Sequence, residues 1–511
     1  MKYLSINKAF WFCGALGAKC FVAMLALWSC ENVSAFQDAA ENAPASDSPA
    51  AAQPAPANTP APAPTPPAEP APAQPAPAQP APAQPAPAAV VPVSFKGDIA
   101  ALLQDHCVAC HGPKKAEGGY RLDSFGKLTQ AGDSGLAVVT PKQIEQSELI
   151  RRLITEDSSE RMPEGRERLP EAQIDLFKRW VAEGAAYDGS SPDEMISGII
   201  PPVKYAAPPE HYNLPIPITA VAWNPAGDAV VVGGYYEATV WNPADGLLMR
   251  RISNLPQRIQ VLRWHPDGQQ LVVGGGSPGR VGEVRFVDFA SGEVKRVLPR
   301  INDVVLDVCF SPDGNRLAIA GADGMIRVYD ISTPEDKPPQ LFSSHSDWVY
   351  SIAWNQDGKR MVSASRDKTA KLYDMEKNEL MLTYSAHGSA VRGVAFNPAG
   401  TEVYSVGADQ KVHRWKSENG EKVGEFGLGG EALRIQRRGP LSLVAGTNSQ
   451  VRLYDMDKPA ELKQLAGHGD WTLSADSHPT DSRVVGGSHS GEVIVWNKDD
   501  GSIVARWIAK P

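Results

Sequence analysis

The chain has 511 residues, of which 42% are hydrophobic and 21% charged, with 50 Lys and Arg against 59 Asp and Glu. This length exceeds one ordinary domain, and the apolar fraction is too high for general disorder. The formal net charge of −9 argues against nucleic acid as the main partner, because phosphate binding requires a basic surface. The chain has 6 cysteines, too few for a disulfide framework at this length.

Residues 1–35 have the features of an export signal. A positively charged start precedes a short apolar segment, Cys20–Leu27, and Val33–Ala35 offers the small residues that a signal peptidase recognises. Two alternatives stay open: an uncleaved N-terminal anchor, and lipidation at Cys30, because LWSC resembles a bacterial lipobox. Each alternative exports the rest of the chain. We therefore expect a periplasmic or cell-envelope protein, with a membrane tether at its N-terminus under either alternative.

Residues 36–93 are predicted to be a Pro/Ala-rich disordered linker. Of the 44 prolines, 18 lie between Pro44 and Pro92, and the unit PAPAQ repeats within this stretch. Proline fixes φ and lacks the backbone donor, so helix and sheet are both excluded. The segment also lacks the large apolar side chains that a core requires. Alternating Pro and Ala favours extended polyproline II, which predicts a semi-rigid tether.

The next segment, residues 94–189, begins with a helical pattern that leads into a cysteine motif. Apolar residues recur at helical spacing up to position 103, and Cys107, Cys110 and His111 follow in the order C-x-x-C-H. This is the attachment signature of c-type haem. Two thiols at this spacing each form a thioether with a haem vinyl group, and the adjacent histidine gives Nε2 to the iron. The motif predicts one covalently bound haem c, with His111 as the proximal iron ligand.

Other uses of the two cysteines fit the segment less well. A thioredoxin-like redox pair requires a βαβ context, and a zinc site requires a second ligand pair, whereas the segment contains no further cysteine. Cys309 lies in the apolar run VLDVCF and is expected to be a small buried core residue.

The candidate distal ligand is Met162, the only methionine of the segment. A thioether is a soft neutral ligand, and His/Met ligation raises the reduction potential of a haem. Pro163 is expected to stiffen the loop that presents the sulfur. The alternative is that Met162 only fills a gap in the packing. A second helix is predicted from Pro170 to Glu183, with one apolar face.

The segment resembles the planctomycete-type cytochrome c domain. The motifs that carry the resemblance are CVACHG (107–112), GGYRLDS (118–124), AGDSG (131–135), QSELIRRL (146–153), MPEG (162–165) and EAQIDLFKRWVAEGA (171–185). The resemblance implies a small all-α electron-transfer module with His111 and Met162 as axial ligands. The family commonly has Met-Pro-Pro at the ligand, and Glu164 replaces the second proline here. Tyr120 and Arg121 are candidate contacts to the haem propionates, and a surface ion pair is the alternative for Arg121.

After a linker (residues 190–217), residues 218–511 form a repeat array. First strands end at aromatic residues spaced by 41 to 46 positions: Trp223, Trp264, Phe310, Trp354 and Phe396. Seven third strands are expected, and they end at Trp241-Asn242, Val287-Asp288, Tyr329-Asp330, Tyr373-Asp374, Trp415-Lys416, Tyr454-Asp455 and Trp496-Asn497. A period of this length, with Pro- and Gly-containing turns, predicts a seven-bladed β-propeller.

The repeats resemble WD40 repeats, in which a histidine, a serine, an aspartate and an aromatic residue form a hydrogen-bonded set. Blade five supplies His387, Ser405, Asp409 and Trp415, and blade four supplies His345, Ser363, Asp367 and Tyr373. Blades one, two and six are degenerate. Because the histidines occur one per repeat around a ring, a structural role is favoured over a metal site. Residues 502–509 are expected to form the fourth strand of blade seven, so that adjacent blades close the ring and residues 205–217 lie outside it.

These features predict a multidomain protein: a disordered tether, a small all-α cytochrome c domain and an all-β seven-bladed WD40-like propeller. We expect an exported c-type cytochrome that transfers single electrons, while its propeller docks a redox partner protein. No nucleophile–base constellation marks the propeller as an enzyme. Two alternatives stay open: a periplasmic oxidoreductase whose propeller is catalytic and whose haem accepts the electrons, and a haem-based sensor or scaffold.

Overall fold

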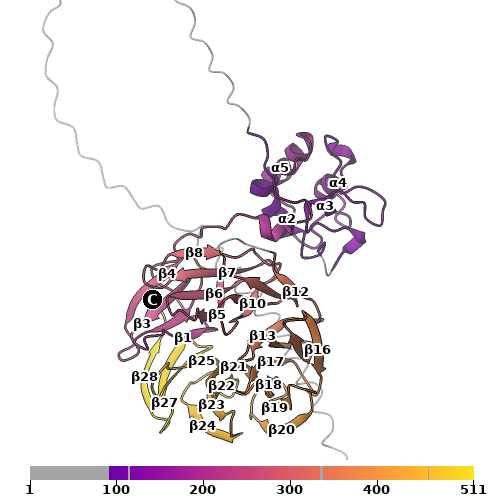
Figure 1. Cartoon of the computed structure of the whole chain (residues 1–511). Helices are drawn as coiled ribbons and strands as arrows, with labels where there is room; N and C mark the ends of the chain where they lie inside the picture. Colours follow the sequence, from indigo (N-terminus) through magenta and orange to yellow (C-terminus); the bar gives the residue numbers. More distant parts are fainter. Residues whose placement is uncertain (1–90, 113–114, 334–337, 459) are drawn as a thin grey trace, which may run out of the picture. The chain divides into compact units, whose positions relative to one another are not determined.

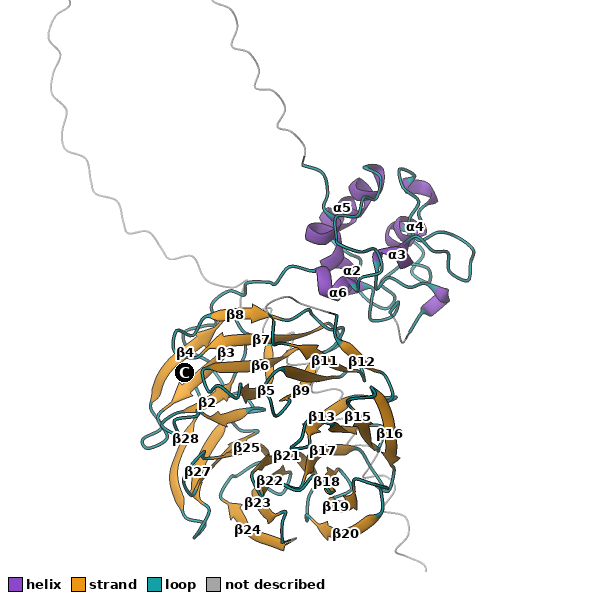
Figure 2. Ribbon diagram, in the orientation of Figure 1, coloured by secondary structure: helices purple, strands orange, loops and turns teal. Residues whose placement is uncertain are grey.

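The computed structural model describes residues 91–112, 115–333, 338–458 and 460–511 (Figure 1). The predicted export signal and nearly all of the predicted Pro/Ala-rich linker lie outside these residues. Helices occupy the chain between residues 95 and 199, and strands occupy it from residue 221 onward (Figure 2). The predicted fold class is therefore confirmed. Within the part of the chain that the structure describes, no helix is long and apolar enough to cross a membrane.

The helical domain contains both predicted helices. The first is the helical turn η1 (Phe95–Ile99), which continues directly as α2 (Ala100–His106), and the second is α5 (Glu171–Ala182). Shorter elements were not predicted, since each is too short to show a periodic pattern. These are η2 (Glu117–Gly119), α3 (Phe125–Leu128), η3 (Ile144–Gln146), α4 (Glu148–Ile154) and α6 (Ile196–Ile199).

Helix α5 buries one apolar face in the core of this domain. Ile174, Phe177, Trp180 and Val181 are at most 1% exposed. The Trp180 ring lies 5.4 Å from that of Phe95, so the two predicted helices share one core. Complete burial of side chains of this size stabilises the fold by roughly 1.5–3 kcal/mol each.

The remaining chain forms seven antiparallel four-stranded sheets, each built from consecutive strands. Blades one and two comprise β1 (Val221–Trp223), β2 (Val230–Gly233), β3 (Glu237–Trp241), β4 (Leu248–Ser253), β5 (Arg258–Trp264), β6 (Gln270–Ser277), β7 (Val281–Asp288) and β8 (Val294–Val297). Blades three and four comprise β9 (Val305–Phe310), β10 (Arg316–Gly321), β11 (Ile326–Asp330), β12 (Gln340–Phe342), β13 (Val349–Trp354), β14 (Arg360–Ser365), β15 (Ala370–Asp374) and β16 (Glu379–Tyr384). Blades five to seven comprise β17 (Val391–Phe396), β18 (Glu402–Gly407), β19 (Lys411–Lys416), β20 (Lys422–Gly427), β21 (Ala432–Arg438), β22 (Leu441–Gly446), β23 (Gln450–Asp455), β24 (Ala460–Ala466), β25 (Thr472–Ser477), β26 (Arg483–Ser488), β27 (Glu492–Asn497) and β28 (Ile503–Ile508).

The ends of the first and third strands of the blades agree with the sequence prediction. All five aromatic markers end the first strands of their blades, and all seven third-strand endings lie at or beside the last residue of a third strand. The first strands of blades six and seven, β21 and β25, lack an aromatic marker. Blade six turns instead at Gly439, whose φ of 59° suits glycine.

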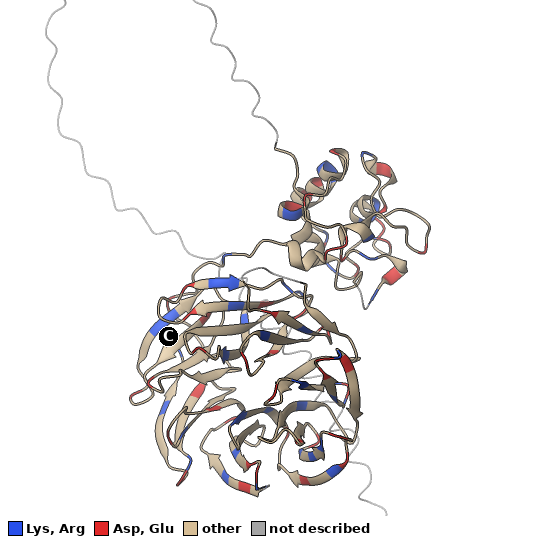
Figure 3. Ribbon diagram, viewed as in Figure 1, with Lys and Arg blue, Asp and Glu red and all other residues tan. Residues whose placement is uncertain are grey.

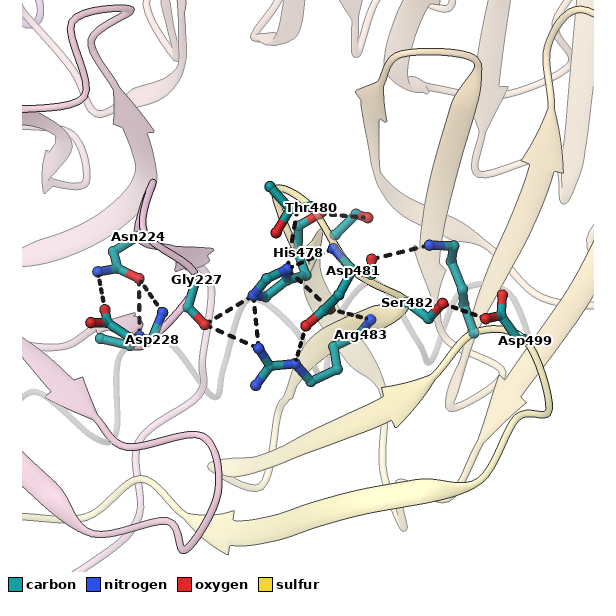
Figure 4. A network of polar contacts seen from close by, with 12 residues as sticks. Asn224, Gly227, Asp228, His478, Thr480, Asp481, Ser482, Arg483 and Asp499 are labelled. Atoms are coloured by element: carbon teal, nitrogen blue, oxygen red, sulfur yellow. Dashed lines mark hydrogen bonds and ion pairs between the residues drawn. The ribbon is translucent and has the colours of Figure 1, made fainter.

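Adjacent blades close the ring, as predicted. Strand β28 completes blade seven, and residues 208–217 belong to no strand. Trp223 and Trp241 of blade one share a core with Trp507 of blade seven. Polar contacts reinforce the junction (Figure 4): His478 Nε2 lies 2.9 Å from the carbonyl oxygen of Gly227 in the first turn of blade one.

The segment before the ring is hydrogen-bonded to blades one and two, which the sequence did not reveal. Tyr212 donates a 2.7 Å hydrogen bond to the carboxylate of Glu237, a side chain that is 1% exposed. Arg251 forms an ion pair with the same carboxylate and donates to the carbonyl oxygen of Glu210. The backbone N–H of Tyr205 donates to Asn254, in the connection between blades one and two, and Arg285 of blade two donates to the carbonyl oxygen of Val203. These partners satisfy a buried carboxylate in a blade whose repeat signature is degenerate.

Blades four and five contain the predicted hydrogen-bonded sets. His387 Nδ1 lies 2.8 Å from the Asp409 carboxylate and its Nε2 lies 2.8 Å from Ser405 Oγ, to which the indole of Trp415 donates. The equivalent histidine of blade four lies 2.7 Å from its aspartate and 2.6 Å from its serine. Both nitrogens of His387 therefore have partners within the blade, as its structural role requires.

A second histidine adds acid sensitivity to blade five. The ring of His413 stacks on that of His387 at 3.9 Å, and its Nδ1 lies 3.0 Å from Tyr384 Oη. Burial and the neighbouring His387 lower the pKa of His413 to about 4, and burial lowers that of His387. Asp409 and Glu425 oppose this shift, and Lys422 adds to it.

We expect His413 to make the stability of the propeller depend on acid pH. An unfolded histidine titrates near 6.5, so between that pH and the lowered folded pKa the unfolded state binds more protons. The contribution to stability is fully present above the unfolded pKa and is lost as the pH falls toward the folded one. In His413→Phe, the loss of unfolding free energy between about pH 7 and pH 4.5 should be smaller by about 2 kcal/mol, because this range covers nearly two pKa units between the unfolded and folded values, at roughly 1.4 kcal/mol each. Urea unfolding followed by tryptophan fluorescence checks this, and equal losses in both proteins would contradict it.

Candidate haem site

The cysteine motif continues helix α2 as one further turn. The N–H of Cys107 donates to the Leu103 carbonyl at 2.9 Å, and the carbonyl of Cys107 accepts from Cys110 at 3.2 Å and from His111 at 3.0 Å. These bonds coil the backbone so that residues three and four positions apart come from the same side of the turn. A Cβ on Gly112 would lie 2.6 Å from the Val108 carbonyl oxygen, so only glycine fits after the histidine.

Both cysteines of the motif are free thiols. Cys107 is partly buried, and burial together with the nearby Cys110 raises its pKa to about 12. Cys110 is exposed, and Lys115 Nζ lies 3.9 Å from its sulfur. The third free thiol, Cys309 in β9, is partly buried against the core between blades three and four, close to its expected role.

The Nδ1 of His111 is buried without a hydrogen bond among the residues that the structure describes, in contrast to the paired Nδ1 atoms of His345 and His387. A buried polar atom without a partner costs roughly 1–3 kcal/mol. The motif assigns the iron to the other ring nitrogen, Nε2, so the unpaired Nδ1 shows that no described residue orients the ring through this atom.

Met162 lies in the loop between α4 and α5. Its side chain is half-buried, and its backbone N–H donates to the carbonyl oxygen of Arg152 in α4 at 2.9 Å. Two thiols outside any disulfide, an imidazole and a thioether are the donor set that a covalently bound His/Met haem requires. The residues present thus fit the haem that the motif implies.

Tyr120 and Arg121 already have partners in the helical domain. Arg121 forms a bidentate ion pair with the buried carboxylate of Asp123, at 2.6 and 2.7 Å. An ion pair was the alternative to a propionate contact for this arginine. The hydroxyl of Tyr120 lies 2.5 Å from Ser134 Oγ and donates to the carbonyl oxygen of Leu136. As candidate propionate contacts, both residues remain predictions.

The sequence did not identify the charged residues that fasten the loop of Met162. Glu148, Arg151 and Arg152 occur at i, i+3 and i+4 in α4 and form ion pairs. This spacing puts the three side chains on one helical face. If the segment ELIRR is taken to be helical, its sequence therefore predicts ion pairs between the glutamate and the two arginines.

In the propeller, a polar network crosses the central channel, around which the first strands of the blades lie innermost (Figure 1). Arg434 of blade six and Arg263 of blade two both contact one oxygen of Asp307 in blade three, at 2.9 and 3.2 Å. Arg263 also donates to Gln436 of blade six, which donates to Asp476 of blade seven at 2.7 Å. Elsewhere, positive and negative residues are interspersed along the ribbon (Figure 3). The network links blades that are not neighbours.

The comparisons with known proteins agree with this geometry. The family model described as Planctomycete cytochrome C matches residues 107–165. The model described as WD domain, G-beta repeat matches four segments: 292–330, 336–374, 378–416 and 460–497. The unmatched blades are one, two and six, which are the blades predicted to be degenerate. A search of curated proteins gave no match.

The fold and the family matches together show a cytochrome c-like domain followed by a β-propeller. More closely, the first domain is similar to the planctomycete type of cytochrome c, and the propeller has seven blades, four of which match the WD40 repeat.

Proposed function

We propose that this protein is an exported c-type cytochrome that transfers single electrons and docks its redox partner through the propeller. The observation that carries the proposal is the turn after α2, where two cysteines that form no disulfide and the adjacent His111 lie within five residues on one coil of backbone. The signal features of residues 1–35 support export, because c-type haem is characteristic of proteins that carry such a leader.

The residues divide the work of holding one haem. Cys107 and Cys110 supply the thioether sulfurs, His111 supplies the proximal nitrogen, and Met162 supplies the distal sulfur. When bound, the haem iron provides a one-electron couple between Fe(III) and Fe(II). The neutral thioether of Met162 would favour the reduced state.

The propeller offers a surface suited to a protein partner. Trp348 is 39% exposed just before β13, and the guanidinium of Arg366 lies 4.9 Å from its ring. Beside it, Arg392 lies 4.4 Å from the ring of Tyr350. Tryptophan, tyrosine and arginine are the residue types most enriched where proteins bind one another.

The test is the state of the haem in the exported protein. We expect the haem to remain with the polypeptide after denaturation and solvent extraction, and the reduced protein to show the absorption bands of a low-spin c-type haem. Absence of those bands, or complete extraction of the haem, would refute the proposal.

Met162→Ala tests the distal ligand separately. Loss of the thioether should abolish the Met–Fe(III) charge-transfer band and lower the reduction potential by on the order of 0.1 V, a fraction of the roughly 0.8 V that axial ligands span. Spectroelectrochemical titration of both proteins measures the change. An unchanged spectrum and potential would exclude Met162 as a ligand and favour a haem with an open coordination site.

A further inference from the structure

A buried carboxylate organises the helix that faces the Met162 loop. Glu148, the first residue of α4, is only 5% exposed, yet it accepts hydrogen bonds from two arginines. Arg151 binds it through Nε at 2.7 Å and Nη2 at 2.8 Å, and Arg152 binds it through Nε at 2.7 Å. These bonds lower the pKa of Glu148, so it stays ionised and fixes both guanidinium groups.

The two arginines in turn hold the chain on the N-terminal side of the methionine. Arg151 Nη1 pairs with the carboxylate of Glu160 at 2.5 Å, and Arg152 Nη1 donates to the Glu160 carbonyl oxygen at 3.3 Å. The backbone of Arg152 also accepts the N–H of Met162. One turn of α4 therefore fixes the residue two positions before the sulfur and the ligand residue itself.

The other end of the same loop is anchored by an apolar side chain: Leu169 is 4% exposed and packs in the core of the helical domain. Its ion pairs lie at the surface. Arg168 lies 3.8 Å from Glu156 and 3.6 Å from Glu171, and the two carboxylates are 90% and 59% exposed. Long exposed pairs of this kind contribute about 0–1 kcal/mol. The buried ion pairs and their hydrogen bonds to the loop are therefore on the side of Met162.

We propose that Glu148, Arg151 and Arg152 are positioning residues that hold Met162 ready to bind the haem iron. This inference rests on the proposed ligation by Met162. A thioether is a weak neutral ligand, so its occupancy depends on how little ordering the loop still requires when the bond forms. Outer partners that orient a metal ligand typically change its binding by about 10–100-fold when they are removed.

The experiment uses the full haem-loaded chain in its oxidised state and titrates it with imidazole, which competes with the sulfur for the iron. Glu148→Gln should raise the apparent imidazole affinity by about tenfold or more. Glu160→Gln, which removes one of the contacts, should raise it by roughly two- to threefold. Arg168→Gln is the matched control in the same loop and should leave the affinity unchanged. Haem content should be the same in all of these proteins.

The outcomes separate this inference from the proposed function. Unchanged imidazole affinity in both the Glu148 and Glu160 variants, with a raised affinity in Met162→Ala, overturns the positioning role alone. Unchanged affinity in Met162→Ala overturns the ligation and the positioning role with it. If Glu148→Gln fails to fold, Glu160→Gln decides the question, because its side chain is 44% exposed and its loss does not bury a charge.

Discussion

Exported protein in which serine replaces both Cys107 and Cys110 is expected to retain no haem after denaturation. A hydroxyl does not form the thioether that the thiol forms with a haem vinyl group, so only the iron–ligand bonds would hold the haem. Those bonds are lost when the polypeptide unfolds. Haem-stained gels and the mass of the intact chain measure the result directly.

The single variants and a third cysteine complete this test. Cys107→Ser and Cys110→Ser each leave one thiol on the turn after α2, so each should retain a reduced amount of covalent haem. Cys309→Ser is the matched control, because it removes a free thiol that packs in the propeller. Equal haem retention in the double variant and the natural protein would show that the haem is held in another way.

The sequence predicted most of the architecture because its signals are local and periodic. The helical spacing before Cys107 and the apolar face of α5 each lie within a dozen residues, and each third strand of the propeller ends at the expected aromatic or apolar residue or at the residue after it. The haem motif is stronger still, since three residues in a fixed order specify the chemistry.

What the sequence did not predict depends on residues that are distant along the chain. Asp307 and Arg434 are 127 positions apart, and only the closed ring brings them together. Helix α4 is seven residues long, too short for its periodicity to identify it. The tyrosines before the ring lie in a segment without a pattern, and their partners Glu237 and Asn254 become evident only once blades one and two are formed.

The cross-channel network should make Asp307 one of the most sensitive positions of the propeller. Its carboxylate, 3% exposed, lies between Arg434, 18% exposed, and Arg263, 23% exposed. It also accepts the N–H of Ile352 from blade four, at 3.2 Å. Asp307→Asn keeps the shape of the side chain but leaves two guanidinium groups facing each other without a counter-charge. Removing one partner of a buried ion pair typically costs about 3–5 kcal/mol.

We therefore expect Asp307→Asn to lower the melting temperature of the propeller by several degrees, at roughly 2 °C or more per kcal/mol for a domain of this size. Glu376→Gln is the control: its pair with Lys359 is 2.9 Å long but about two-thirds exposed on both sides, and such pairs contribute about 0–1 kcal/mol. The double variant Asp307→Asn, Arg434→Met should recover part of the loss, because a buried pair replaced on both sides costs less than one broken on one side. Melting followed by tryptophan fluorescence measures all three.

A loss of melting temperature in Asp307→Asn no larger than that of the control would mean that the channel charges do not stabilise the ring. Recovery in the double variant would assign the loss to the unpaired guanidinium groups.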